Sequence, residues 1–248
     1  MIGTVTDLWR HPVKSMGGEQ VAEVAFDGGG VPGDRQWAVR PVDGGDTVLT
    51  ARLTPRLLHA RSRLVGNDVE VVLPDGSRLV GTGVESDAAL SGWLGFPVTL
   101  AAADPAVPAS YEVVLDDGTV AAMPTRPGSF QDSRRATLHL LSAATLDGDD
   151  PRRYRPNVVV QGDGAPFDDD AWVGARLRIG ATAEVDVIKR CNRCVMVTRA
   201  QPGLPADRSR LTRLVQREVT LGVMATVAVP GPVRTGDPVV RVAGGSTA

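Results

Sequence analysis

Short apolar runs separated by turn residues make up most of the chain. The runs are rich in β-branched residues, and most are shorter than a typical helix. The 28 glycines and 18 prolines among the 248 residues fit a protein with many turns. The pattern therefore predicts a mainly β protein, with expected strands at residues 2–9, 21–26, 36–42, 47–51, 69–73, 78–80, 98–102, 136–141, 157–160, 172–179, 183–188, 222–229 and 233–242.

Helical spacing is confined to a few short segments. An amphipathic helix is expected at residues 88–94, and a second helix is possible at 211–215. Ser142 is placed to cap a short helix at 142–146. These candidates do not alternate with strands, which argues against a doubly wound sheet. The sequence thus favours a β-rich α+β fold.

A proline-containing stretch at residues 104–108 predicts a linker. A chain of 248 residues allows one large β domain or two smaller ones. We therefore expect a domain boundary here, with residues 1–103 forming an N-terminal β domain and residues 104–248 forming a second domain.

Charge and hydropathy narrow the range of functions. The net charge of −2 and the pI of about 5.9 do not suggest a nucleic-acid partner. No run approaches 18 apolar residues, so we expect no membrane span, and residues 1–15 do not resemble a signal peptide. A cytoplasmic location is therefore expected. Positive charge is almost all arginine, because Lys14 and Lys189 are the only lysines.

The candidate chemistry is concentrated around the two cysteines, Cys191 and Cys194. Lys189, Arg190 and Arg193 surround them, and positive charge favours thiolate over thiol. Three interpretations are open: a zinc site, a dithiol redox pair, or one thiolate that binds a soft metal while basic groups hold the anionic remainder of a cofactor.

Each interpretation makes a different demand on the chain. Zinc needs two more ligands, but His11, His59 and His139 share no local motif. A redox pair normally opens a helix, whereas residues 195–198 are β-like in sequence. The third interpretation needs only one cysteine, and the other can be a small buried residue.

Several motifs, in chain order, resemble the MOSC domain and the β-barrel domain that precedes it. They are His11-Pro12-Val13-Lys14-Ser15, Gly33-Asp34-Arg35-Gln36-Trp37, Thr50-Ala51-Arg52, Phe130-Gln131-Asp132, His139-Leu140-Leu141-Ser142, Arg155-Pro156-Asn157-Val158-Val159-Val160, Trp172-Val173-Gly174 with Leu177-Arg178-Ile179-Gly180, and Arg190-Cys191-Asn192-Arg193-Cys194-Val195-Met196-Val197-Thr198. The resemblance covers nearly the whole chain. Its layout is similar to that of mitochondrial amidoxime-reducing components and bacterial N-hydroxylated-purine reductases.

This resemblance implies an N-terminal β-barrel-like domain followed by a MOSC β-barrel with few short helices. It implies an oxidoreductase that binds the molybdenum cofactor (molybdopterin) and reduces small N-hydroxylated substrates with electrons from a separate electron-transfer protein. The alternative is a non-redox carrier of the cofactor, or of sulfur as a persulfide on Cys194. Pyridoxal phosphate binding is a further property that the resemblance to sulfurases implies.

The resemblance also assigns roles to individual residues. Cys194 is expected to bind molybdenum, with Cys191 as the lesser candidate. The residues expected to contact the rest of the cofactor are Lys14, Ser15, Arg35, Ser142, Arg155, Asn157, Arg193 and Thr198. One departure is visible after Cys194, where residues 195–202 lack the double threonine and the acid that relatives often carry. That departure bears on substrate scope.

Overall fold

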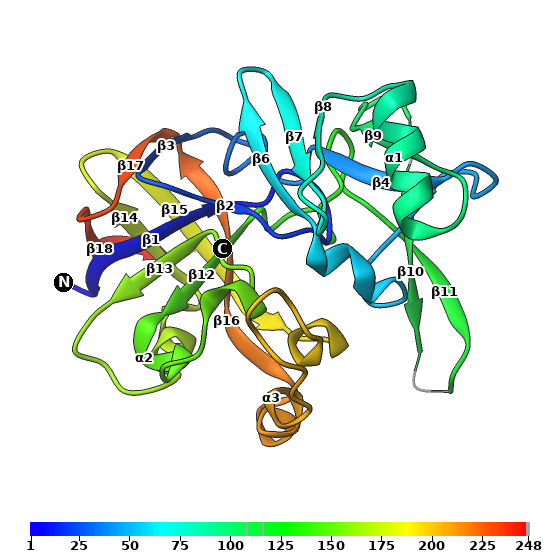
Figure 1. Cartoon of the computed structure of the whole chain (residues 1–248). Coiled ribbons are helices and arrows are strands. Elements are labelled where there is room, and N and C mark those ends of the chain that lie inside the picture. Colours follow the sequence, from blue (N-terminus) through cyan, green and yellow to red (C-terminus); the bar gives the residue numbers. More distant parts are fainter. Residues whose placement is uncertain (108, 116, 247–248) are drawn as a thin grey trace.

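A closed β-barrel forms one side of the protein in the computed structural model (Figure 1). The structure describes residues 1–107, 109–115 and 117–246. Within these residues seven strands pair in a ring, and β2 (Glu19–Val21) extends it from β1. The ring order is β1 (Gly3–Arg10), β13 (Val158–Gln161), β12 (Leu138–Ser142), β16 (Thr220–Val229), β15 (Ala183–Asn192), β14 (Ala175–Ile179) and β18 (Pro238–Ser246), which returns to β1. The β12–β13 pair is parallel, and the other pairs of the ring are antiparallel.

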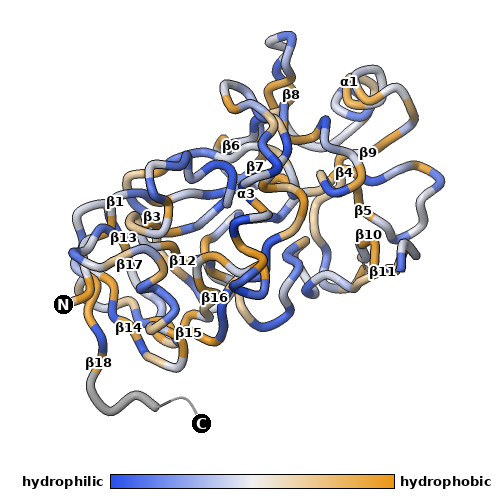
Figure 2. Tube along the Cα trace, turned by 90° about the horizontal axis from the view of Figure 1, so that it is seen from below, coloured by the Kyte–Doolittle hydropathy of each residue, from blue (hydrophilic) through white to orange (hydrophobic). Residues whose placement is uncertain are grey.

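Alternating side chains fill the barrel. In β15, Ala183, Val185 and Val187 are buried, whereas Glu184 and Asp186 between them are partly exposed. This two-residue period directs one face of each strand inward, where the aliphatic side chains form the main core. Figure 2 shows the apolar stretches of β12, β15 and β16 separated by polar turns. The predicted mainly β fold is confirmed.

A second core lies in the N-terminal half, beside the barrel (Figure 1). It is built from smaller sheets and one helix, α1 (Val84–Leu94). Its sheets pair β4 (Trp37–Pro41) with β9 (Val98–Ala102) and join β6 (Arg61–Val65), β7 (Asp68–Val72) and β8 (Arg78–Val80). A further sheet joins β5 (Thr47–Val48), β10 (Ser110–Val114) and β11 (Val120–Pro124), and its Val48 and Tyr111 belong to a separate small cluster.

Short elements complete the fold. β3 (Glu23–Phe26) pairs with β17 (Gly231–Arg234). The remaining elements are the helices α2 (Ala143–Leu146) and α3 (Ser209–Thr212) and the 3-10 helices η1 (Pro55–His59), η2 (Pro151–Arg153), η3 (Asp168–Trp172), η4 (Val195–Thr198) and η5 (Val215–Arg217). No helix in the described residues is long and apolar enough to cross a membrane.

One local prediction is wrong. Residues 195–198 form the 3-10 helix η4 instead of the β-like segment expected from the sequence. The Thr198 hydroxyl donates to the Val195 carbonyl at 2.8 Å, a local hydrogen bond that favours a turn over an extended chain.

Strand pairing crosses the boundary predicted at residue 104. β1 from the N-terminal part pairs with β13 and β18, and β10 from the later part pairs with β5. The predicted linker at residues 104–108 ends on residue 108, which lies outside the described residues. The division into residues 1–103 and 104–248 stays a prediction.

Candidate functional site

A cavity of about 470 Å³ is lined jointly by the barrel and the N-terminal half. Its walls come from segments that lie far apart in the sequence. These segments contribute residues between positions 14 and 52, between 111 and 139, between 153 and 157, and between 189 and 196, together with Met224. The folded barrel therefore assembles the cavity, and no single motif could form it.

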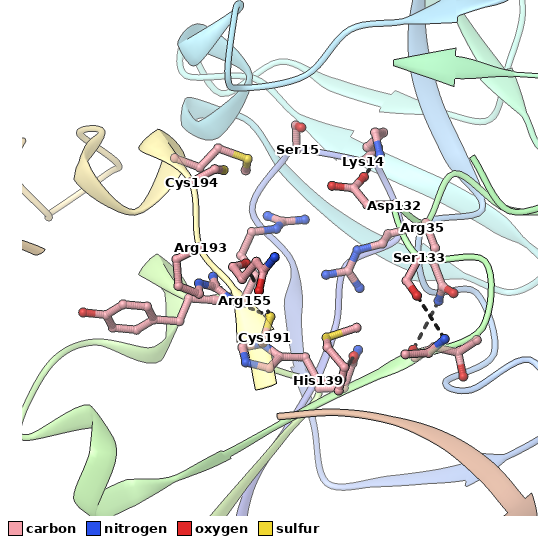
Figure 3. A pocket seen from close by; sticks show the side chains of 18 of the residues that line it. Lys14, Ser15, Arg35, Asp132, Ser133, His139, Arg155, Cys191, Arg193 and Cys194 are labelled. Carbon is pink, nitrogen blue, oxygen red and sulfur yellow. Dashed lines mark hydrogen bonds and ion pairs between the residues drawn. The ribbon is translucent and has the colours of Figure 1, made fainter. Parts of the chain in front are cut away.

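Most of the predicted site residues meet in this cavity (Figure 3). The residues that line it are Lys14, Ser15, Arg35, Arg155, Asn157, Arg193 and Cys194. Ser142 and Thr198 are not among the lining residues. The Ser142 amide donates to the buried Asp169 carboxylate at 3.1 Å, and Thr198 closes the turn of η4.

Three of these residues have an unusual backbone conformation. Ser15, Arg35 and Arg155 have φ angles of 68°, 53° and 55°. This left-handed region costs energy for residues other than glycine, and such residues tend to gather at functional sites. The surrounding hydrogen bonds hold them there: the Ser15 hydroxyl, for example, accepts the Ala51 amide at 3.0 Å. The local chain is thus fixed to present these side chains to the cavity.

Lys14, Asp132 and Arg52 form a charged cluster on one wall. Lys14 is buried, forms an ion pair with Asp132, and donates to the Phe130 carbonyl at 2.7 Å. Arg52 donates to the other oxygen of Asp132 at 2.6 Å. Both cations also lie over the ring of Tyr111, at 4.4 Å and 5.1 Å from its centroid.

The electrostatics of this cluster favour its charged form. Burial raises the pKa of Asp132, but the charges of Lys14 and Arg52 outweigh it and hold that pKa below its usual value. Burial lowers the pKa of Lys14, and Asp132 opposes that shift. Burial also raises the pKa of Tyr111 to about 12. Asp132 is therefore ionised at neutral pH.

Arg155 is a buried cation with spare hydrogen-bonding capacity. Its Nη1 donates to the Met16 carbonyl, but its buried Nη2 has no hydrogen-bond partner in the described part of the chain. Burial, followed by the nearby charge of Arg35, lowers the pKa of Arg155 to about 9. Arg35 itself pairs with the buried carboxylate of Asp34. An anion entering the cavity would satisfy the free guanidinium group of Arg155.

The two free cysteines occupy different places in the cavity (Figure 3). Cys194 is partly exposed and precedes the first residue of η4. Cys191 is buried at the end of β15, where its Sγ accepts a hydrogen bond from Arg193 Nη1 at 3.1 Å. Burial would raise the pKa of Cys191, but His139 and Arg193 lower it to about 6. Cys191 is buried, as one interpretation allowed, but it also faces the cavity.

The cavity is strongly cationic overall. The cations that line it are Lys14, Lys189, Arg35, Arg52, Arg153, Arg155 and Arg193. Asp132 is the one carboxylate among the described lining residues. The described part of the chain contains no group of three His, Cys, Asp or Glu side chains able to hold a metal ion. The lining therefore offers hydrogen-bond donors suited to an anion, together with two thiols of the kind that bind soft metals.

Sequence reasoning did not assign several lining residues to the site. Arg52, Asp132 and His139 lie inside motifs that carried the family resemblance, so that resemblance was the available signal. Tyr111 lies on β10, a strand that the apolar pattern did not predict. Its ring reaches the cavity through tertiary packing, for which the local sequence has no signal.

Family models identify the class of protein to which this closed barrel and its thiol-containing, cationic cavity belong. The model described as the MOSC N-terminal beta barrel domain matches residues 2–105, and the MOSC domain model matches residues 134–240. The chain therefore belongs to the family of MOSC domain proteins in which the N-terminal beta barrel domain precedes the MOSC domain.

Individual proteins are similar to this chain over most of its length. Mitochondrial amidoxime reducing component 2 of Homo sapiens is 28% identical, over 97% of this chain and 84% of the relative. The protein of the same name from Rattus norvegicus is also 28% identical, over the same shares of both chains. The crystal structure of the YUAD protein from Bacillus subtilis has a TM-score of 0.49 and 16% identity, and the match covers 96% of this chain and 94% of that one.

These comparisons relate the chain to molybdenum-cofactor oxidoreductases at the level of the family. Neither the matched domain descriptions nor the names of these relatives refer to pyridoxal phosphate, so that expectation has no support. The names of the relatives place those proteins in mitochondria. The predicted cytoplasmic location of this chain stays a prediction.

Proposed function

We propose that the cavity binds the molybdenum cofactor, and that the protein is a reductase of small N-hydroxylated molecules that takes electrons from a separate protein. One observation carries the proposal: the partly exposed thiol of Cys194 shares a cavity with buried guanidinium groups that have unused donors. The names of the relatives, which describe amidoxime reducing components, support the substrate class.

The residues present fit this group. A thiolate is the ligand type that a soft metal centre prefers, and Cys194 supplies one. Guanidinium groups bind phosphate through paired hydrogen bonds. Arg155 Nη2 and Arg193 Nε are buried and have no partner among the residues that the structure describes, so both have donors available for an anionic cofactor. In this assignment Cys194 holds the metal, while Lys14, Ser15, Arg35, Arg155 and Arg193 hold the pterin and its phosphate.

Asn157 has a supporting part in the same assignment. Its Oδ1 accepts the His139 amide at 3.1 Å, and its Nδ2 donates to the Trp9 carbonyl at 3.3 Å. Both side-chain groups are thus committed to joining β12 and β1 next to the cavity. Ser142 and Thr198 likewise stabilise neighbouring segments and do not face the cavity.

The bound cofactor would supply two-electron redox chemistry that side chains lack. Reduction of an N-hydroxylated molecule consumes two electrons and two protons and releases water. The protein's own part is to orient the substrate, supply positive charge and exclude bulk water. The buried Lys14 and Arg155 favour negative charge within the cavity. In this proposal the two electrons come from a separate electron-transfer protein.

Elemental analysis tests the proposal most directly. The full chain, expressed in a host that makes the cofactor, should contain molybdenum and no zinc. Cys194→Ser should lose the metal, whereas the matched control Cys191→Ser should retain it. Retention of full molybdenum and full reductase activity in both variants would show that the ligand assignment is wrong.

The alternative is a carrier that holds sulfur as a persulfide on Cys194. The partial exposure of that thiol at the cavity is the observation that favours it. Mass spectrometry of the intact protein separates the two functions. A carrier would show the added mass of one sulfur atom without molybdenum, whereas the reductase would release pterin and molybdenum on denaturation.

A further inference from the structure

The environment of Cys191 is more elaborate than a small buried residue requires. Its thiol lies on the cavity wall and accepts a hydrogen bond from Arg193. Arg193 is fixed at two further points: Nη2 donates to the Tyr154 carbonyl at 2.7 Å, and the guanidinium lies 5.7 Å from the centroid of the Tyr154 ring. This cation is therefore held in place beside the sulfur.

His139 approaches the same sulfur from another strand. It belongs to β12, and β16 lies between β12 and β15 in the barrel. Gly222 on β16 leaves the space that this approach requires, because a Cβ at Gly222 would lie 2.4 Å from His139 Nε2. His139 is 4% exposed, and its Nε2 has no hydrogen-bond partner among the described residues. A buried imidazole without a partner thus faces the cavity beside a thiol.

Most of the charged groups around Cys191 favour an anionic sulfur. His139 on β12 and Arg193 after β15 interact with it most strongly, and together they outweigh the effect of burial on its pKa. Lys189 on its own strand and Arg155 and Arg153 across the cavity add positive charge. Asp132 is the opposing carboxylate of the described lining, and it is neutralised by Lys14 and Arg52.

We propose that Cys191 is a covalent modification site, a thiolate nucleophile that small anionic electrophiles reach through the cavity and modify. The cationic lining concentrates such reagents at the sulfur. A modified sulfur no longer accepts the hydrogen bond from Arg193 in the same way, and its new substituent fills part of the cavity. Modification therefore closes the site to other anions.

The reaction is a simple displacement when iodoacetate is the probe. The Cys191 thiolate attacks the methylene carbon, a sulfur–carbon bond forms, the carbon–iodine bond breaks, and iodide leaves with the electron pair. The thiolate is already deprotonated, so no proton transfer accompanies the step. No oxidant or reductant is needed.

The chain suits a direct test because it has only two cysteines. In full-length Cys194→Ser, Cys191 is the sole thiol, and in Cys191→Ser the sole thiol is Cys194. We expect the alkylation rate of Cys194→Ser to reach half its maximum near pH 6 in the folded protein. In urea the same thiol should have an ordinary pKa of about 8.5.

The charge of the reagent gives a second readout that does not depend on accessibility. Iodoacetate and iodoacetamide are similar in size, so the ratio of their rates cancels the effect of burial. For Cys191 this ratio should be about 10-fold higher in the folded than in the urea-unfolded protein, because a cationic cavity concentrates anions. An equal ratio in the two states, a half-maximal rate near pH 8.5, or no labelling of folded Cys194→Ser would overturn the inference.

A variant of the activating residue checks the cause. In the double variant Arg193→Gln with Cys194→Ser, the half-maximal pH should rise toward the value in urea. Thermal melting must show that this protein is folded, and His139→Gln serves in its place if it is not. An unchanged pH profile in a folded variant would contradict activation by the two residues. Alkylation of Cys191 does not require molybdenum. The alkylation experiment can therefore succeed even if the proposed reductase function is wrong.

Discussion

At the scale of single residues, the cavity combines strained backbone with buried charge. Arg155 shows both, because it has a φ of 55° and a buried guanidinium with no ion pair to any described carboxylate. Neither feature stabilises the fold. A strained, buried arginine of this kind is expected where a residue serves binding and the rest of the fold supplies the stability that it costs.

Two substitutions of Arg155 separate these features. Arg155→Gly and Arg155→Ala delete the same charge, but only glycine adopts a positive φ without steric cost. We expect the glycine variant to be more stable than the alanine variant by about 1 kcal/mol in urea unfolding. Both variants should lose molybdenum when expressed in a cofactor-making host. An alanine variant as stable as the glycine variant would show that the backbone is not strained at this position.

The cluster around Asp132 makes a different prediction. In Asp132→Asn, the buried Lys14 loses its counter-charge. Because 43% of the Asp132 side chain is exposed to the open cavity, solvent screening limits the loss of unfolding free energy to about 2 kcal/mol at pH 7. Glu23→Gln, which removes an exposed ion pair with Arg234, is the matched control and should show no measurable change.

The pH dependence of the Asp132 effect follows from the direction of its pKa shift. The pKa of this carboxyl is lower in the folded protein than in the unfolded chain. Its contribution is therefore complete above the unfolded pKa of about 4 and is lost as the pH falls below it. The stability difference between the native protein and Asp132→Asn should narrow in urea titrations from pH 5 to pH 3. A constant difference would mean that the carboxylate does not stabilise the cluster.

At the scale of elements, β16 shows how a glycine positions a neighbouring strand. Gly222 has a φ of 76°, and a Cβ there would also lie 2.9 Å from the Leu140 carbonyl oxygen. Gly45 has a φ of 59° but open space around it. Gly222→Ala should therefore cost about 3 kcal/mol of unfolding free energy, and Gly45→Ala about 1 kcal/mol. Equal costs would mean that β12 and His139 move aside without penalty.

The local sequence predicted some elements well and others poorly, for physical reasons. The strands at residues 69–73, 78–80 and 98–102 were predicted because the apolar runs that signal them are local. The apolar residues 195–197 were mistaken for a strand, because apolar side chains are buried equally well in a 3-10 turn. The β10–β11 hairpin was missed, although Asp117-Gly118 between valines was an available turn signal.

The pairing of strands could not be predicted from the sequence pattern. Nothing in the alternation of residues 2–9 indicates that Val5 will pair with Val160 or that Gly3 will pair with Val239. The cavity depends on these distant pairings. The family resemblance supplied Lys14, Arg35, Arg155 and Cys194, but the contacts of Cys191 with Arg193 and His139 became visible only in the folded chain.

At the scale of the whole molecule, the barrel requires β1 from the N-terminal half. Residues 104–248 alone lack the strand that joins β13 to β18, so an open sheet edge would replace the closed ring. We expect this fragment to show no cooperative urea transition by circular dichroism, whereas the full chain does. Addition of residues 1–12 as a peptide should partly restore the transition. A fragment that unfolds cooperatively on its own would support the predicted domain boundary as an independent folding limit.

Closure of the barrel by β1 also has a consequence during protein synthesis. The partners of β1 lie at residues 158–161 and 238–239, so the first strand to be made must wait for nearly the last. At 5–20 residues per second, the ribosome needs roughly 10 to 50 seconds to make the intervening chain. Throughout that interval the edge of β1 that pairs with β18 has no partner, so the ring stays open. We therefore expect the nascent chain to depend on chaperones, and cofactor loading to begin only after release from the ribosome.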